Sequence, residues 1–248
     1  MARTISVATW NMQEGLGATR SIAESLHLLL AKHDIDVVAL QEVPFERRGF
    51  SSWLRALQVS SEWQFAATRT LSERHYSDVG FSGLATLSRV RLREESFTPF
   101  KVEDTGSVEK VFDKGVQTCI LENEQHQVSK DHVSISNVHM FPFDRFGLSA
   151  HDPEFSNEWQ TLIERITIES GPALLCGDFN TEDRRLLIEH YDSIESALKG
   201  TPTHEGKAFD DILFTRRWLT LEDAQCVVTN SDHDFCFAKF QVQDEQID

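Results

Sequence analysis

The sequence predicts an α/β fold in which two halves of similar strand and helix content pack as two layers. Short apolar runs of strand length alternate with amphipathic helical segments along the chain. We see no Pro- or Gly-rich linker, internal repeat or low-complexity tract. We therefore expect residues 1–248 to form a single domain, a length that one α/β domain commonly reaches.

The first half opens with a strand, a helix and a second strand. Residues 4–11 alternate in polarity and stop at Asn11. Residues 21–33 place four apolar residues on one helical stripe, namely Ile22, Leu26, Leu29 and Leu30. Residues 35–43 form a short apolar run, which is typical of a strand buried on both faces. Further strands are expected in three segments separated by charged turns, namely residues 80–90, 111–122 and 132–141.

The second half begins with a helix and continues with strands. In residues 152–166, Asp152 is the expected N-cap and Pro153 the expected first helical residue. One face of this helix is apolar and comprises Phe155, Trp159, Leu162, Ile163 and Ile166. Strands are expected in residues 172–180, 207–215, 226–233 and 233–240.

Composition and charge restrict the class of partner. The chain has 24 Lys and Arg residues against 40 Asp and Glu residues, a formal charge of -16, so its general field repels polyanions such as nucleic acid. A polyanion must then be held locally, which carboxylates that bind a divalent metal would achieve. The alternative interpretation is a solvated acidic surface that aids solubility.

The start of the chain predicts where the protein is located, and the cysteines predict whether its thiols are reduced. Residues 1–10 have no long apolar core followed by a cleavage site, and no stretch approaches membrane-spanning length, so we expect a cytoplasmic protein without membrane association. The four cysteines contain no CxxC pair and lie in apolar strand-like runs, so we expect reduced core residues.

Polar residues terminate successive apolar strands, and strand ends on one rim of a sheet converge on a crevice. These residues are Asn11, Glu42, His139, Asp178, Asn180, Asp210, Asp232 and His233. Oxygen ligands with few His and no Cys suit Mg²⁺ or Mn²⁺ and indicate phosphoryl chemistry, in which histidines handle protons. Taken singly, each residue has a simpler explanation: a turn, a helix cap, a core histidine at 139, or two aspartates flanking an edge strand.

The order of seven short motifs resembles the endonuclease/exonuclease/phosphatase superfamily, which contains DNase I, exonuclease III, sphingomyelinases and inositol-polyphosphate phosphatases. The motifs are TWN, VVALQEV, GLATLSR, SNVHM, LLCGDFN, FDDILF and SDH, and they span nearly the whole chain. The resemblance implies a four-layer α/β/β/α sandwich, two mixed β-sheets packed face to face with helices outside. It also implies a metal-dependent phosphoester hydrolase using Mg²⁺ or Mn²⁺.

The resemblance assigns a role to each motif residue. Glu42 is the principal metal ligand, with Asn11 and Asp232 helping to hold the ion. Asp178 and Asn180 face the scissile phosphate and His139 donates a hydrogen bond there, while Asp210 orients His233. The group that deprotonates water stays open between Asp178 and His233.

Three positions refine the resemblance. His139 resembles the DNase I and sphingomyelinase branch rather than apurinic endonucleases, which carry Tyr there. Asp211 departs from the pattern, as a carboxylate that is either solvated or unfavourable to an anionic substrate. Lys114 with Gly115 resembles the basic residue and glycine that open a strand in the family, where the cation would touch phosphate, although a hairpin turn with a solvated Lys is an equal alternative.

Substrate is the least determined property. A nuclease acting on DNA or RNA is the first choice, although no basic stripe with interleaved aromatic residues is present. The enzyme alternative is a phosphatase or phosphodiesterase for a small nucleotide, an inositol phosphate or a lipid headgroup. The non-enzyme alternative is an inactive binding module, which retention of the whole residue set disfavours. The sequence identifies no protein partner.

Overall fold

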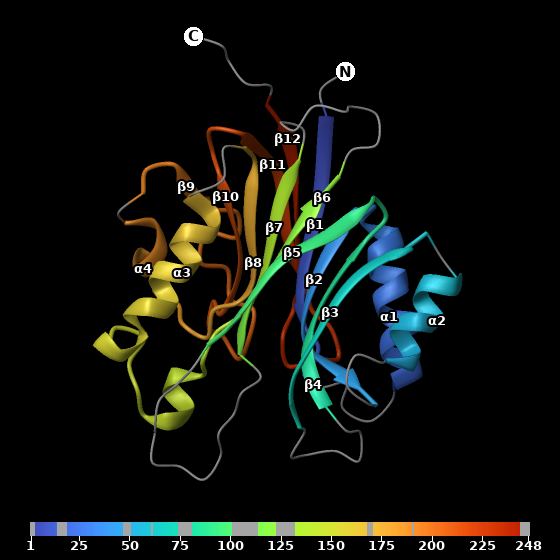
Figure 1. The fold of residues 1–248 in the computed structure, drawn as a ribbon, viewed down its shortest axis with the longest axis horizontal. Helices are drawn as coiled ribbons and strands as arrows, with labels where there is room; N and C mark the ends of the chain where they lie inside the picture. Colours follow the sequence, from blue (N-terminus) through green and yellow to red (C-terminus); the bar gives the residue numbers. More distant parts are fainter. Residues whose placement is uncertain are drawn as a thin grey trace.

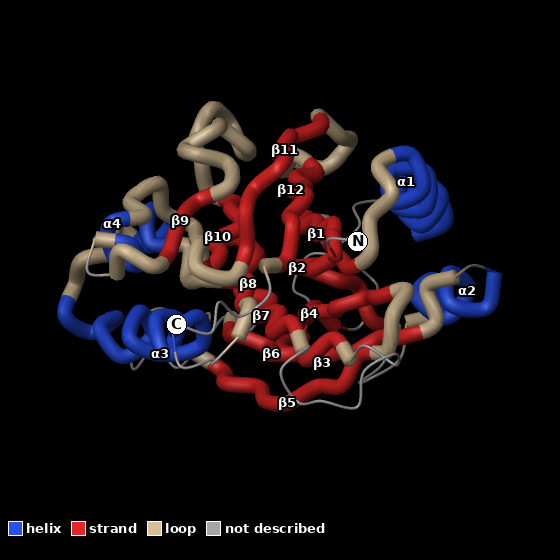
Figure 2. Tube along the Cα trace, turned by 90° about the horizontal axis from the view of Figure 1, so that it is seen from above, coloured by secondary structure: helices blue, strands red, loops and turns tan. Residues whose placement is uncertain are grey.

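The computed structural model describes residues 3–13, 19–46, 51–60, 62–73, 81–100, 114–122, 132–167, 171–189 and 191–243. Two six-stranded sheets pack face to face, with α1 and α2 outside one sheet and α3 and α4 outside the other (Figures 1 and 2). The chain is thus an α/β/β/α sandwich, and the predicted four layers are confirmed.

The first sheet has the strand order β11-β12-β1-β2-β4-β3. Only β1 and β2 of these strands pair in parallel, through a connection that contains α1 (Thr19–Lys32). A second helix, α2 (Ser52–Ser60), follows β2. The strands are β1 (Arg3–Asn11), β2 (Val37–Phe45), β3 (Phe65–Glu73), β4 (Phe81–Ser88), β11 (Leu219–Val227) and β12 (Phe235–Val242).

The second sheet has the order β5-β6-β7-β8-β10-β9, and β7 and β8 are its parallel pair. Their connection contains α3 (Ser156–Thr167), and the short α4 (Arg185–Ile188) follows β8. The strands are β5 (Leu92–Pro99), β6 (Gly115–Leu121), β7 (Val133–His139), β8 (Ala173–Asp178), β9 (Ile194–Ser196) and β10 (Asp210–Thr215). Because β10 lies between β8 and β9, the alternative that Asp210 and Asp211 flank an edge strand is wrong.

Three apolar clusters fill the three spaces between the layers. Leu26 and Leu30 of α1 pack on Ala8 of β1, and the apolar face of α3 packs on the second sheet. Val7, the neighbour of Ala8, points the other way, into the cluster between the sheets. Central strands are therefore buried on both faces, which explains why their sequences are nearly continuous apolar runs.

The start of the third helix differs from the prediction. Pro153–Phe155 form a separate 3-10 turn, and α3 begins at Ser156. Asp152 precedes that turn, but its carboxylate accepts a hydrogen bond from the backbone N–H of Ser149 instead of capping a helix. Proline at 153 still marks the first turn of helical backbone, since its fixed φ suits that position.

Polar side chains join the two sheets near the predicted site. Gln41 Nε2 donates to Asn137 Oδ1 across the sheets at 2.8 Å, and Asn137 Nδ2 donates to the carbonyl oxygens of Leu40 and Ala85, each at 3.1 Å. Gln41 and Asn137 are fully buried. Since such groups are costly to bury without partners, these bonds fix how one sheet sits on the other.

Candidate active site

Four strands of the second sheet contribute to one row of the site. Gly115 of β6 pairs with His139 at the end of β7, His139 pairs with Asp178 at the end of β8, and Asp178 pairs with Asp210 at the start of β10. His139, Asp178 and Asp210 are each 1% exposed. The sheet itself, not a loop, therefore brings these three side chains together.

The first sheet supplies the opposite side of the site. Asn11 ends β1, and its Nδ2 donates to Asp178 Oδ2 at 3.0 Å. Glu42 lies in β2 at a break in the strand register, with a positive φ of 50°, and its Oε1 is 3.7 Å from Nε2 of His139. A positive φ is uncommon outside glycine and here accompanies the re-aimed side chain of a bulge.

The GDFN segment surrounds the carboxylate of Asp178. The backbone N–H of Asn180 donates to Asp178 Oδ1 at 2.8 Å, and Asn180 Nδ2 donates to the carbonyl oxygen of Met140 at 2.8 Å. Asn180 has a φ of 50° and turns the chain. Gly177 has a φ of 149° but lies within β8, where a Cβ atom would be 1.9 Å from the carbonyl oxygen of Val138. Glycine is required there by close strand approach, not by a turn.

His233 lies just before β12 and is held from three directions. Its Nδ1 is 2.7 Å from Asp210 Oδ2, and its Nε2 is 3.9 Å from Asp178 Oδ2. Its carbonyl oxygen accepts hydrogen bonds from Trp10 Nε1 and Thr229 Oγ1. The predicted pairing of Asp210 with His233 is thus present in the geometry.

The surroundings of the site shift the pKa values of its groups in different directions. Burial, Lys114 and His233 hold the pKa of His139 well below its usual value, which favours the neutral imidazole. Burial also lowers the pKa of His233, but Asp210, with Asp178 and Asp232, outweighs it and raises that pKa to about 10. Burial raises the pKa of Asp178, which His233 partly opposes.

Lys114 lies inside the site. It is buried, and its Nζ contacts Nε2 of His139 and lies 3.3 Å from Nδ1 of the same ring. The alternative of a solvated lysine in a hairpin turn is therefore wrong. Gly115 opens β6 beside His139 and Lys114 directly precedes it, as the resemblance implied.

Asp211 lies outside the site. Neighbouring residues of a strand face opposite sides, and Asp211 is buried on the face away from Asp210. Its Oδ2 accepts hydrogen bonds from Arg184 Nε at 2.9 Å and from Ser196 Oγ at 2.8 Å. Both alternatives for this carboxylate, solvated or facing an anionic substrate, are wrong.

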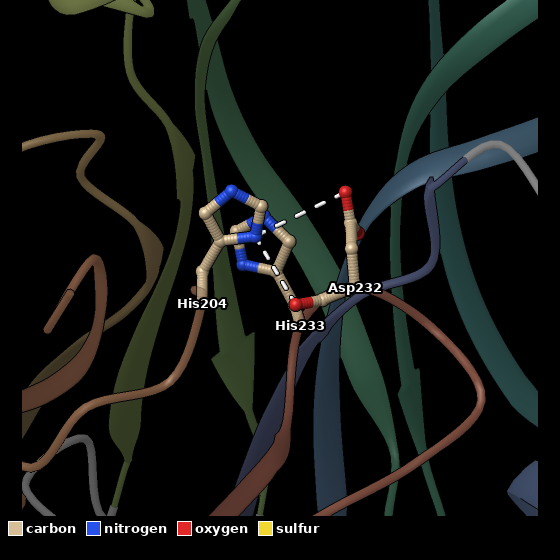
Figure 3. A group of neighbouring side chains, drawn as sticks. All are labelled: His204, Asp232 and His233. Carbon is tan, nitrogen blue, oxygen red and sulfur yellow. Dashed lines mark hydrogen bonds and ion pairs between the residues drawn. The ribbon is translucent and has the colours of Figure 1, made fainter. Parts of the chain in front are cut away.

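His204 belongs to the site but did not stand out in the sequence. Its ring stacks on that of His233 with centroids 4.2 Å apart, and its Nδ1 is 3.1 Å from the carbonyl oxygen of Asp232 (Figure 3). Phe209 stacks on His204 with centroids 5.6 Å apart. An isolated histidine in a polar loop has no periodic pattern; the nearby Gly200, Pro202 and Gly206 indicate turns but not the position of the ring.

The donor set fits a hard divalent cation. Among the described residues, two groups bring carboxylate and imidazole ligand atoms within 4.8 Å of one another: Asp178, Asp210 and His233, and His204, Asp232 and His233. Glu42 lies near the first group, with its Oε1 3.7 Å from Nε2 of His139, whereas Asp232 is a member of the second group. One oxygen of Asp210 is buried without a hydrogen-bond partner in the described chain. Because Asp210 holds His233, which both groups share, as an imidazolium, the ligand atoms open to a cation are the carboxylate oxygens, which favour a hard ion.

Comparison with known proteins identifies solved structures that share the fold. Among solved structures, an endonuclease/exonuclease/phosphatase from Beutenbergia cavernae aligns with a TM-score of 0.69 and 13% identity, over 97% of this chain and 72% of that one. A humanized TDP2 from D. rerio gives 0.66 and 13%, over 96% and 99%. The human Nocturnin catalytic domain gives 0.65 and 16%, over 97% and 94%.

These structures share the fold, and the family assignment comes from the sequence. A search of curated proteins gives no match. The model of the Endonuclease/Exonuclease/phosphatase family matches residues 8–233, which include every residue of the site described above. The chain therefore belongs to the endonuclease/exonuclease/phosphatase family.

Proposed function

We propose that the protein is a divalent-metal-dependent phosphoester hydrolase, a phosphodiesterase or nuclease that cleaves DNA or RNA by in-line attack of water. The observation that carries the proposal is the surroundings of Asp178. One buried carboxylate has two amide side chains, from Asn11 and Asn180, and two imidazoles, from His139 and His233, within 3.9 Å. Such a cluster positions a water, a phosphate and a proton acceptor together.

Asn11, Glu42 and Asp232 are the proposed ligands of Mg²⁺ or Mn²⁺. The bound ion would neutralise negative charge on the phosphate. Lys114 adds a positive charge next to His139, whose Nε2 also lies 3.7 Å from Glu42 Oε1. The chain itself therefore supplies both the oxygen ligands and a cation for an anionic group.

The environments of Asp178 and His233 favour different roles. His233 is held as an imidazolium by Asp210, since its pKa is raised to about 10, so it suits donation of a proton or hydrogen bond to an oxygen of the phosphate. Asp178 has a raised pKa because it is buried, which makes it the better proton acceptor. We therefore assign Asp178 as the general base, with His139 and Asn180 as hydrogen-bond donors to the phosphate.

The family and its relatives support phosphoester cleavage more strongly than a particular substrate. Members of the family generally hydrolyse phosphoesters, and one D. rerio TDP2 structure holds a single-strand DNA product. The formal charge of -16 favours the second candidate, a phosphatase or phosphodiesterase of small phosphoesters such as nucleotides, inositol phosphates or lipid headgroups, because a small anion meets less of the repulsive field. The match over residues 8–233 supports one domain as the active unit.

A substrate panel tests the proposal. Supercoiled plasmid, single-stranded DNA, RNA, bis-p-nitrophenyl phosphate, nucleotides and inositol phosphates are each incubated with Mg²⁺, Mn²⁺ or EDTA. The expected result is metal-dependent plasmid nicking that Asp178→Asn lacks and that Glu195→Gln, an exposed carboxylate on β9, retains. Cleavage of small esters alone selects the second candidate.

The same panel separates an enzyme from an inactive binding module. A binding module would cleave no substrate with either metal, and Asp178→Asn would then be indistinguishable from the wild type. That outcome, with a folded protein, would overturn the proposal.

A further inference from the structure

Two cysteine side chains meet across the outer pair of strands in the first sheet. Cys226 of β11 and Cys236 of β12 are register partners, and their Sγ atoms lie 2.8 Å apart. The other two cysteines, Cys119 on β6 and Cys176 on β8, belong to the second sheet and are separated by β7. The prediction of four core thiols therefore holds for three positions, while Cys226 is partly exposed.

The cysteine pair brackets the segment that carries the SDH motif. Residues 228–234 join β11 to β12, and within them lie Asp232, a proposed metal ligand, and His233. Ser231 Oγ ties this segment to the carbonyl oxygen of Asn11 at 2.9 Å. A covalent link between the two sulfurs would close an eleven-residue ring, residues 226–236, around the motif.

The two thiols differ in a way that suits stepwise oxidation. Cys226 lies on the edge strand β11 and is partly exposed, whereas Cys236 is buried. Burial holds the pKa of Cys236 well above its usual value, so this thiol is a poor first target for an oxidant. Cys226 is therefore the thiol that is oxidised first. Cys236 already contacts it and can react with the oxidised sulfur.

We propose that Cys226 and Cys236 form a reversible disulfide that closes residues 226–236 into a covalent loop carrying Asp232 and His233. With a peroxide as oxidant, Cys226 sulfur attacks one oxygen, the O–O bond breaks, and a sulfenic acid and water form. Cys236 sulfur then displaces the sulfenic oxygen as a second water. Two thiols lose two electrons and two protons in total, and peroxide is reduced to two waters.

The link restricts the unfolded chain and the loop. Closing a ring removes conformations from the unfolded state, so the oxidised protein should melt at a higher temperature than the reduced one. A small-molecule dithiol should reverse the change by thiol–disulfide exchange. Neither effect depends on phosphoester hydrolysis, so the proposal stands or falls independently of the proposed activity.

The test compares reduced wild-type protein with the same protein treated with hydrogen peroxide. Thiols titrated in denaturant should fall from the four of the sequence to two, and peptide mapping should join the peptides of Cys226 and Cys236 with the loss of two hydrogens. The melting temperature should rise and return to its first value with dithiothreitol. Four remaining thiols, or a link that involves Cys119 or Cys176, would overturn the proposal.

Cys226→Ser is the matched variant, because the site is partly exposed and tolerates a small polar side chain. After peroxide treatment and dithiothreitol-free mapping, it should show no linked peptide and no reversible rise in melting temperature. If its melting temperature rises as much as that of the wild type and falls again with dithiothreitol, ring closure is not the cause and the proposal fails.

Discussion

Asp210 joins the site through the imidazole of His233, which lies 2.7 Å from its Oδ2. Its backbone N–H is bound separately by Thr203 Oγ1, so the main chain stays in place when the side chain is changed. Asp210 is therefore a positioning residue, which holds His233 in one orientation and stabilises its charged form.

The Asp210→Asn variant should lower kcat by about 10²–10⁴-fold, the usual contribution of a positioned acid or base. The increase in melting temperature on adding Mg²⁺ should remain, since Asp210 is not a proposed metal ligand. Hydrolysis of the best substrate of the panel, with circular dichroism to verify folding, checks this. Wild-type turnover in a folded variant would contradict the role of Asp210.

The stacking of the His204 ring on His233 gives a second prediction. Because its imidazole stacks on His233, His204→Phe should keep the stack and retain kcat within a few-fold, whereas His204→Ala should lower it by roughly 2- to 10-fold, the value of one ring contact. Steady-state kinetics of both variants provide the measurement. Equal losses of kcat in both variants, together with a raised KM, would show that Nε2 of His204 contacts substrate instead.

Within β8, one glycine sets how closely two strands approach. Gly177→Ala should destabilise the protein by about 2–4 kcal/mol or prevent folding, because its Cβ would overlap the carbonyl oxygen of Val138. Gly200→Ala is the matched control: Gly200 also has a positive φ, of 78°, but a Cβ there meets nothing within 4 Å, so only about 1–2 kcal/mol should be lost. Urea unfolding compares the two variants, and equal losses would refute the steric explanation.

β10 is anchored by the ion pair between Asp211 and Arg184. Arg184 also donates to the carbonyl oxygens of Ala208 and Phe209, so the pair ties the start of β10 to the segment after β8. Asp211→Ala should cost about 3–5 kcal/mol, since it leaves a buried guanidinium without its partner.

The exposed pair of Lys239 and Glu222 is the control for this ion pair. Glu222→Ala should change the free energy of unfolding by no more than about 1 kcal/mol. Denaturant titration of both variants at one pH is sufficient. A loss for Asp211→Ala that matches the control would mean that the buried pair does not anchor the strand.

For the whole molecule, bound metal should couple to stability. If Mg²⁺ binds the folded site and not the unfolded chain, the melting temperature rises with Mg²⁺ concentration. Glu42→Gln should abolish the rise, whereas Glu195→Gln, on an exposed position of β9, should keep it. Differential scanning fluorimetry with Mg²⁺, Mn²⁺, Ca²⁺ and EDTA is the measurement, and no response of the wild type to Mg²⁺ or Mn²⁺ would contradict metal dependence.

The sequence predicted those parts of the site that lie at the ends of buried strands. Asn11, His139 and Asp178 each follow an apolar run, and such a change of pattern is visible without a structure. The outward direction of Asp211 was also available from strand alternation, since Asp210 faces inward. His204 and the partnership of Cys226 with Cys236 were not accessible, because both depend on the path of a loop whose turn geometry the sequence does not determine.

No helix in the described part of the chain is long and apolar enough to cross a membrane. The helices instead cover the outer faces of the two sheets (Figure 2). The sandwich is thus stabilised by three apolar layers, while the site is assembled at one end of the strands, beyond the last residues of the apolar layer between the two sheets.

The row from Gly115 through His139 and Asp178 to Asp210 sets the scale of the chemistry. Adjacent strands are about 4.8 Å apart, a spacing that backbone hydrogen bonds impose and side chains hardly alter. The spacing of the strands therefore sets the distances among the reacting groups. Exchanging the surrounding loops should change which substrate binds, while the spacing of the groups that contact its phosphate stays constant.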